Sequence, residues 1–436
     1  TEIDPFSTFS LNISDVSFRL AMAALQRGQA PARAAIRSEE FVNAFDYRDP
    51  PPEPGEAVAL HWETARVPWL HDRWLVRFSV AAGETGRPPE EPLNLTVLLD
   101  NSGSMKRADR QEIVAASVNA LAPLVRPQDR LNAVTFARRP QLVAENFAGS
   151  EAPRFVERLL KQVPEGGTNL EAALDLAYAV TARNRVAGQN RIVLLTDGAA
   201  NLGNVEPERL RDMAVEGRQQ AIALDAFGVG WEGYEDATLE ALTRNSDGRY
   251  AFLTDSLHAR RDFAERLAGA LQVAAKNVKV QIEWNPDRVT RFRQIGYERH
   301  RLATEDFRNN TVDAAEIARA ESGTALYVIE VDEAGIGPLG TLRVRYQEPA
   351  SGLYREREWT LMPPRRVPPL DEASPAIRLA ATAAFFAEKL AGLPSASAYD
   401  LRDLDELATG LSTSFDSPQV QQLINALRRA RLLNGE

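Results

Sequence analysis

The sequence contains no cysteine and four histidines. The absence of cysteine excludes disulfide bonds, zinc–thiolate sites and catalysis by a thiol. The histidines, His61, His71, His258 and His300, are scattered along the chain and form no H-E-x-x-H motif, so the sequence offers no zinc-protease signature. A chain without cysteine suits a reducing or an oxidising compartment equally well, so this absence leaves the location open.

Long apolar runs are also missing. No run approaches the roughly twenty residues that a membrane-spanning helix needs. The best candidate, Leu379–Ala387, is short and is flanked by Arg378 and Glu388, so we expect no transmembrane segment in this chain. The chain starts at Thr1 with neither a methionine nor an apolar signal segment, and we expect that an upstream segment has been removed by processing or is left out of this sequence.

Signatures of common enzyme classes are absent too. There is no Walker A motif, and Gly228, Gly230 and Gly233 lack the spacing of a dinucleotide-binding fingerprint. Acidic pairs such as Glu39-Glu40 are more typical of solvated faces and helix starts than of acid/base catalysis. The net charge of −10 argues against a nucleic-acid partner. We therefore expect a binding protein rather than an enzyme.

The 436 residues, 44% hydrophobic and 26% charged, are typical of a soluble protein with two or three folded units. Proline-rich stretches separate segments with different patterns. We expect an N-terminal helical segment (1–54), the first strands of a β-sandwich (55–91), an α/β domain (92–275), the rest of the sandwich (276–362) and a C-terminal helical segment (370–436). The α/β domain would then be an insertion in a loop of the β-sandwich.

Strand and helix patterns alternate within the α/β segment, which predicts a doubly wound, Rossmann-like parallel sheet. Helices are expected there at Leu170–Thr181, Tyr234–Asn245 and Leu257–Ala275. Outside this segment, three serines are expected to cap helices, namely Ser38, Ser374 and Ser417.

The strongest functional signal follows the strand pattern Leu93–Leu99. This strand ends at Asp100, and Ser102 and Ser104 follow it in the order D-x-S-x-S. One carboxylate and two hydroxyls at alternate positions can point at a single spot above the strand end. Hard oxygen donors of this kind suit Mg²⁺ or Mn²⁺, with Ca²⁺ less favoured, rather than zinc.

Two further residues fall at comparable positions. Thr168 lies in the loop EGGTNL, and Asp197 ends the strand pattern IVLLTDG. Ligands of parallel sheets bind beyond the carboxyl ends of the strands, where these residues are expected. With the D-x-S-x-S turn, they resemble the metal-ion-dependent adhesion site of von Willebrand factor type A domains. The resemblance implies direct metal ligation by Ser102, Ser104 and Thr168, and contacts from Asp100 and Asp197 mostly through water.

A second stretch widens the resemblance. The segment FVNAFDYRDPPP (Phe41–Pro52) is similar to the region before the type A domain in bacterial proteins of the YfbK-like group, which is more distantly similar to inter-α-trypsin-inhibitor heavy chains. The resemblance implies an interaction or adhesion module that binds an Asp or Glu carboxylate of a protein partner through a divalent cation. It also implies a place at the cell envelope, with a lipoprotein anchor upstream of residue 1, or outside the cell. The alternative is a cytoplasmic, cochaperone-like partner of an AAA+ ATPase.

We expect no second metal ion beside this site. Lys106 and Arg107 stand where further carboxylates would be needed, and Asp109 is expected to pair with a nearby arginine. The acidic stretch Asp306–Glu316 lacks the EF-hand spacing, so a turn and a helix cap are expected there rather than a calcium site.

Overall fold

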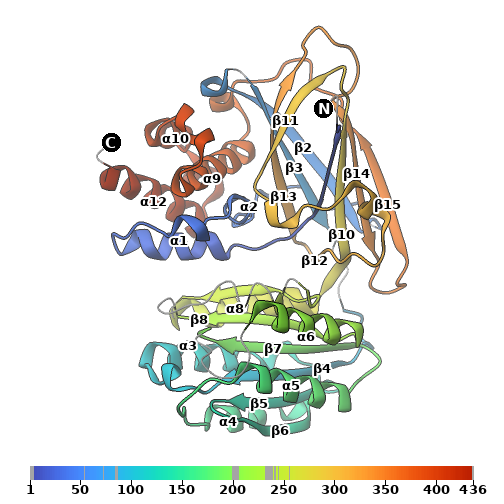
Figure 1. Cartoon of the computed structure of the whole chain (residues 1–436), viewed down its shortest axis with the longest axis vertical. Helices are drawn as coiled ribbons and strands as arrows, with labels where there is room; N and C mark the ends of the chain where they lie inside the picture. The colour runs from blue at the N-terminus through green and yellow to red at the C-terminus, as the bar shows by residue number, and fades with distance from the viewer. Residues whose placement is uncertain are drawn as a thin grey trace. The chain divides into compact units, whose positions relative to one another are not determined.

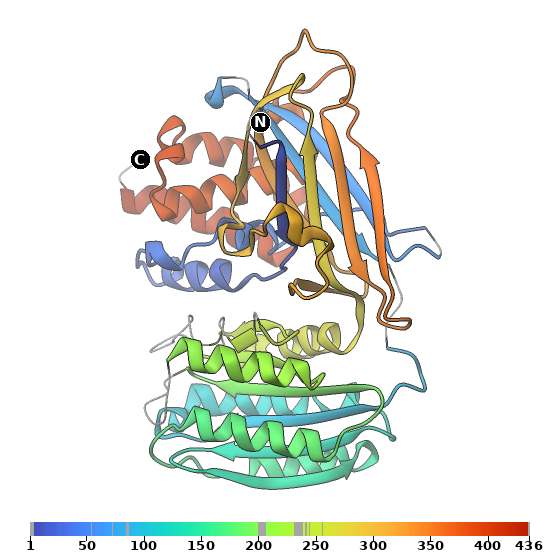
Figure 2. The same cartoon turned by 45° about the vertical axis from the view of Figure 1, so that its right-hand side comes forward.

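A computed structural model of the chain describes residues 4–53, 55–71, 73–83, 87–198, 206–230, 239, 242–243, 245–254 and 256–434. The chain divides into two folded units (Figures 1 and 2). One unit contains residues 86–272, and the other contains residues 1–85 together with 273–436. Within the described residues, no helix combines the length and the apolarity needed to cross a bilayer.

Residues 86–272 are built around a six-stranded sheet with the order β6-β5-β4-β7-β8-β9. All neighbouring strands are parallel except the edge strand β6, which runs antiparallel to β5. Every residue of the central strand β4 is buried, as expected for a strand covered on both faces. The strands are β4 (Leu93–Asp100), β5 (Arg130–Phe136), β6 (Pro140–Ala148), β7 (Gln189–Thr196), β8 (Ala223–Val229) and β9 (Tyr250–Leu253).

Helices cover both faces of this sheet (Figure 1). Apolar side chains of α3, α4 and α8 form one core with the sheet, and those of α5 and α6 form a second core. This two-sided cover is the doubly wound arrangement that the alternating pattern predicts. The helices are α3 (Ala108–Asn119), α4 (Ala152–Leu160), α5 (Leu170–Arg183), α6 (Pro207–Gln219) and α8 (Ser256–Leu271).

The other unit contains two antiparallel sheets, one with the order β1-β10-β14-β15 and with β12 paired to β10, the other with the order β11-β13-β3-β2. Strand β3 precedes the α/β unit in sequence and β13 follows it, yet the two pair directly. Both sheets contribute to one core, in which the rings of Trp284 and Tyr327 lie 5.5 Å apart. The strands are β1 (Phe6–Ser10), β2 (Val58–Val67), β3 (Arg73–Ala82), β10 (Val273–Trp284), β11 (Val289–Ile295), β12 (Ala315–Ala318), β13 (Ser322–Val331), β14 (Gly340–Gln347) and β15 (Tyr354–Thr360).

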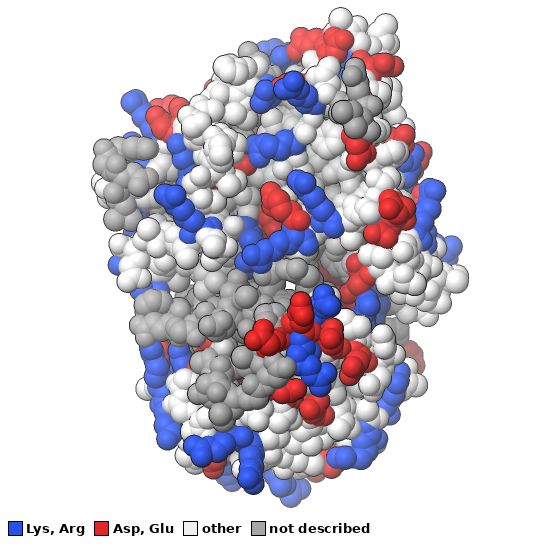
Figure 3. Space-filling view, viewed as in Figure 1, with Lys and Arg blue, Asp and Glu red and all other residues white. Residues whose placement is uncertain are grey.

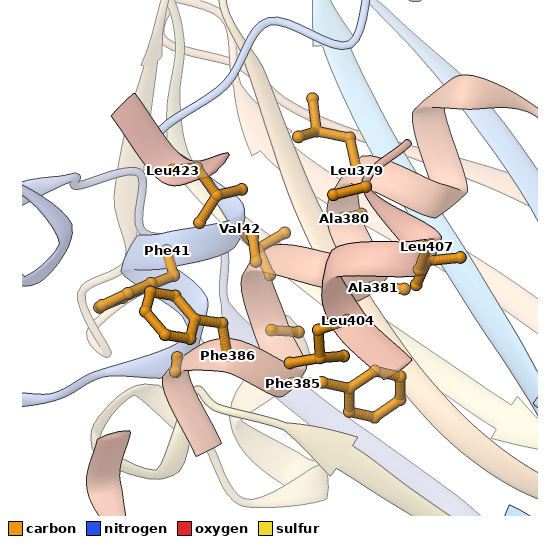
Figure 4. Close-up of a cluster of buried hydrophobic side chains, with 14 of the residues drawn as sticks. Phe41, Val42, Leu379, Ala380, Ala381, Phe385, Phe386, Leu404, Leu407 and Leu423 are labelled. Atoms are coloured by element: carbon orange, nitrogen blue, oxygen red, sulfur yellow. The ribbon is translucent and has the colours of Figure 1, made fainter. Parts of the chain in front are cut away.

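Helices from both ends of the chain form one layer on the sheet β11-β13-β3-β2. Phe41, Phe386 and Leu423 belong to the buried cluster of this layer (Figure 4). They share a core with Leu75 and Leu326 of that sheet. The two helical segments that the sequence suggests therefore pack together as one layer on this sheet. The helices are α1 (Val16–Gln26), α2 (Ser38–Val42), α9 (Pro375–Ala391), α10 (Leu401–Leu407), α11 (Leu411–Phe415) and α12 (Pro418–Asn434).

Three expectations about the N-terminal segment are wrong. Phe6–Ser10 form strand β1 rather than part of a helix, because β10 offers them a hydrogen-bonding edge. Ser38 lies inside α2, whose N-cap is Arg37, so the expected serine cap is not formed there. Glu39 and Glu40 are buried rather than solvated, because α2 is covered by the other helices of the layer. The cap expected at Ser374 is confirmed, since its hydroxyl oxygen accepts from Ile377 N in the first turn of α9.

Two further expectations need correction. The helix expected over Leu257–Ala275 ends where β10 begins, so the boundary expected at 275/276 lies at 272/273. Over Asp306–Glu316 the chain makes a 3₁₀ turn (Thr304–Arg308) and then enters strand β12, so no helix is capped there. Pairing of β12 with β10 favours the strand. The expected helix Tyr234–Asn245 lies largely outside the described residues.

Acidic and basic side chains are interspersed on the face shown in Figure 3. Some charged side chains pair across strands: Arg343 on β14 contacts Glu283 on β10 at 2.8 Å and Glu358 on β15 at 2.7 Å. Exposed ion pairs of this kind contribute about 0–1 kcal/mol each. The sheet β1-β10-β14-β15 therefore carries charged side chains of both signs rather than a basic surface.

Candidate metal centre

The D-x-S-x-S turn follows the central strand of the α/β sheet. Asp100 is the last residue of β4, lies between β5 and β7, and is 2% exposed. Ser102 N donates to Asp100 Oδ1 at 2.9 Å, and the hydroxyl oxygens of Ser102 and Ser104 lie 2.9 Å apart. One buried carboxylate and two hydroxyls therefore stand next to one another at the strand end.

Asp197 comes directly after the neighbouring strand β7 and is buried. The preceding residue, Thr196, ties the two strand ends together: its hydroxyl donates to Asp100 Oδ2 at 2.6 Å and accepts from Gly198 N at 3.0 Å. Gly198 has a φ of 78°, a backbone conformation that glycine adopts without strain, so the chain can turn sharply after Asp197. Thr196 is a site residue that the sequence did not single out.

Thr168 lies on the loop before α5 and is also buried. This loop is fastened at the same edge of the sheet, since Asn169 N donates to Ala137 O at 2.8 Å after the end of β5. Glu165 N donates to Asn101 O at 2.7 Å, which joins the loop to the D-x-S-x-S turn. Hydrogen bonds thus connect the loop that carries Thr168 with the turn that carries the two serines.

Arg110 is a second residue that the sequence did not single out. It lies in the first turn of α3 and is 5% exposed. Its Nη1 forms an ion pair with Asp197 Oδ2 and donates to Ser104 O at 3.1 Å. A fixed positive charge therefore contacts one of the two carboxylates of the candidate site. An arginine in the helix turn after D-x-S-x-S is the signal that could have pointed to it.

The two carboxylates differ in their surroundings. Burial raises the pKa of Asp100 to about 6, and the negative charge of Asp197 contributes in the same direction, although hydrogen bonds from Thr196 and Ser102 offset part of the effect. Asp197 has the guanidinium of Arg110 as its partner. A buried carboxyl with a raised pKa is a group that a nearby cation would stabilise in its charged form.

The donor set fits a divalent cation that prefers oxygen. Asp100, Ser102, Ser104, Thr168 and Asp197 all offer side-chain oxygens, which suits Mg²⁺ or Mn²⁺. Across the described residues, no group of three or more His, Cys, Asp or Glu side chains is arranged to hold a metal ion. A cation here would therefore depend on hydroxyl oxygens in addition to two carboxylates.

The surroundings of the turn include the expected partner of Asp109. Arg107 Nη2 donates to Asp109 Oδ2 at 2.9 Å, and both side chains are a little under half exposed. The prediction that Asp109 pairs with a nearby arginine is confirmed. This ion pair also lowers the pKa of the Asp109 carboxyl, chiefly through the hydrogen bonds from Arg107.

Comparison with known proteins extends over most of the chain. Residues 95–199 match the family model described as "von Willebrand factor type A domain", residues 1–77 match "von Willebrand factor", and residues 269–433 match "Uncharacterized protein YfbK, C-terminal". The chain is 30% identical over 416 residues to YfbK of Escherichia coli (strain K12), covering 89% of this chain and 72% of that protein.

More distant similarities agree with this match. The chain is 26% identical over 197 residues to human inter-alpha-trypsin inhibitor heavy chain H4, which covers 42% of this chain and 21% of that protein. A von Willebrand factor type A structure from Catenulispora acidiphila superposes with a TM-score of 0.52 at 15% identity, over 88% of this chain and 91% of that one, and supports the fold. With a type A domain around the site and a YfbK C-terminal region after it, the chain belongs to the YfbK family of von Willebrand factor type A proteins.

Proposed function

We propose that this protein binds a protein partner through a divalent cation at the carboxyl ends of β4 and β7. Ser102, Ser104 and Thr168 would hold Mg²⁺ or Mn²⁺ directly, and Asp100 and Asp197 would support it mostly through water. The cation would supply an electrophilic centre that accepts an Asp or Glu carboxylate of the partner. The type A domain, a module that commonly mediates protein interaction or adhesion, supports this class of function.

One observation carries the proposal: the Ser102 and Ser104 hydroxyl oxygens lie 2.9 Å apart beside the buried carboxyl of Asp100. Neutral hydroxyl donors leave most of the positive charge of a cation uncompensated. The ion pair between Arg110 and Asp197 reduces the negative charge at the site still further. A site with so little negative charge of its own favours a carboxylate supplied from outside.

The direct test is calorimetric titration of the full chain with Mn²⁺ and with Mg²⁺. The wild-type chain should bind about one ion, and Asp100→Asn together with Ser102→Ala should abolish binding. Asp109→Asn is the matched control, because Asp109 is an exposed acid near the turn that pairs with Arg107. No heat of binding from either ion, or equal loss in the control, would contradict the metal site.

Partner binding needs a second assay. Capture of proteins from the source organism on the immobilised full chain should depend on Mg²⁺ and disappear with EDTA. The same capture with the Asp100→Asn, Ser102→Ala chain should fail even in Mg²⁺. A partner that binds equally well with EDTA would contradict a metal-bridged carboxylate.

Two wider proposals accompany this function. We propose that the α/β unit is an insertion in the β-sandwich, which is supported by the pairing of β3 with β13 across it. Residues 86–272 expressed alone should then fold and unfold cooperatively. We also propose a location at the cell envelope or outside the cell, as the family resemblance implies; fractionation of cells that produce the tagged protein from its native gene would test this against a cytoplasmic, cochaperone-like role.

A further inference from the structure

A cavity of 380 Å³ lies beside the candidate metal site, between α3 and the end of α4. Ligand pockets in proteins commonly measure about 300–1,000 Å³. The cavity is large enough for one or two bulky side chains. Its walls are mostly apolar and include Met105, Val114, Leu159, Leu160, Val163 and Pro164.

The cavity and the candidate metal site share residues. Asp100 and Asn101 line the cavity as well as forming the start of the D-x-S-x-S turn. Asn101 Nδ2 donates to Val163 O at 2.6 Å, and Asn101 O accepts from Glu165 N at 2.7 Å. These two bonds hold the wall that carries Val163 against the turn. A group bound at the metal site would therefore lie next to the cavity.

The wall of the cavity exposes apolar side chains to solvent. Val163 is 75% exposed and Leu160 is 36% exposed. Covering such side chains is favourable, so a partner that reached them would gain affinity. Lys161 also lines the cavity, and its ion pair with Glu157 at 2.6 Å lies at an exposed position where it contributes little. The cavity thus offers an apolar interior and a positively charged side chain beside the candidate metal site.

We infer that this cavity is a specificity pocket for the same partner, and that it receives a bulky apolar side chain close in sequence to the metal-binding carboxylate. This inference rests on the proposed function, because the carboxylate at the metal site places the partner over the pocket. It names the partner's recognition element: an Asp or Glu with a Leu, Ile, Met or Phe within a few residues. The carboxylate supplies metal dependence, and the apolar residue supplies selectivity.

The test uses short synthetic peptides and the full chain in Mn²⁺. Each peptide has one Asp in a Gly/Ser background, and a Leu stands one to four positions before or after the Asp. A matched set has Ala in place of Leu. Calorimetric titrations compare the two sets in Mn²⁺. Methyl NMR of the Leu and Val side chains then reports on Val114, Leu159 and Val163 directly. The NMR samples contain diamagnetic Mg²⁺, because paramagnetic Mn²⁺ would broaden the signals of residues beside the site. At least one Leu position should bind about tenfold more tightly than its Ala match.

Two variants test the pocket itself. Ala115→Phe on α3 fills the cavity, and Val163→Ser removes an exposed apolar wall with little risk to folding. Both should remove the preference for Leu while binding of the Asp-Ala peptides in Mn²⁺ stays. Ile336→Ser is the control, because Ile336 is 92% exposed in the other unit and should leave the preference unchanged.

The outcomes separate the two proposals. Equal binding of Leu and Ala peptides in Mn²⁺ would overturn the pocket and leave the proposed function standing. Binding of Leu peptides that persists in EDTA would also overturn the inference as stated, because the pocket would then act without the metal. If no Asp peptide binds in Mn²⁺, the metal-bridged function fails and the pocket's role fails with it.

Discussion

Glu40 should make the stability of this protein depend on pH near neutrality. The side chain is buried in the helical layer, where its Oε1 accepts from Arg37 Nε at 2.7 Å and its Oε2 accepts from Ser17 N at 2.6 Å. Burial raises the pKa of Glu40 from its ordinary value of 4.5 to about 7, although the charge of Arg37 and the Ser17 N–H act in the opposite direction. The perturbation to test is Glu40→Gln, which resembles the protonated acid.

The direction of this pH dependence follows because the folded chain holds the Glu40 proton more tightly than the unfolded chain does. Because the pKa of Glu40 is higher in the folded chain, the contribution of its proton to stability is fully present below about pH 4.5 and is lost as the pH rises through about 7. One pKa unit corresponds to about 1.4 kcal/mol, so the contribution of Glu40 to the free energy of unfolding changes by about 3 kcal/mol over this pH range. Glu40→Gln removes this pH dependence, so its stability relative to wild type should rise by up to about 3 kcal/mol between about pH 5 and about pH 8. Loss of the ion pair with the buried Arg37 adds a cost that is nearly the same at both pH values and does not alter this difference.

Urea unfolding followed by tryptophan fluorescence between about pH 5 and about pH 8 measures this difference. Five of the six tryptophans lie in the unit that contains Glu40, namely Trp62, Trp69, Trp74, Trp284 and Trp359. Glu406→Gln serves as the control, because Glu406 lies on α10 of the same helical layer but is largely exposed. If the free energy of unfolding varied with pH in the same way for wild type and Glu40→Gln, the reasoning would be refuted.

Three further changes have expected outcomes. Asp225→Asn should destabilise the chain by about 3–5 kcal/mol in urea unfolding. The reason is that the buried guanidinium of Arg191 loses the bidentate carboxylate that it contacts at 2.9 Å. A loss below about 1 kcal/mol would contradict this expectation. Phe386→Ala should cost about 3–5 kcal/mol by the same method, since it opens a cavity in the fully buried helical core, and an unchanged midpoint would count against that core. Arg110→Gln should tighten Mn²⁺ binding in calorimetry, because it removes a positive charge that contacts Asp197, whereas weaker binding would show that Arg110 supports the site.

Local patterns account for the parts of the site that could be predicted. The strand that ends at Asp100 and the two serines after it are adjacent in sequence, so hydrophobic pattern and turn chemistry suffice to identify them. Sequence patterns did not identify Arg110 and Thr196, because their partners, Asp197 and Asp100, lie 87 and 96 residues away along the chain. A single arginine or threonine has many possible partners, and only the folded sheet brings the right one within reach.

The same distinction holds for the fold. Repeating strands and helices predict the doubly wound sheet, because each element shows its own periodicity. Phe6–Ser10 are too short to show a period, and they become a strand because β10, far along the chain, pairs with them. Glu40 carries a charge that is typical of a surface, so sequence alone could not reveal that it is buried against Ser17 of α1 and Arg37.

The pairing of β3 with β13 imposes an order on folding while the chain is being synthesised. Strands β2 and β3 emerge from the ribosome early, but β13 is made only after all of residues 86–272. The α/β unit can therefore complete itself first, whereas the hairpin of β2 and β3 waits with Trp74 and Phe78 lacking their final neighbours. Nascent chains stalled before β13 should bind ribosome-associated chaperones through this hairpin, and release should coincide with the emergence of β13.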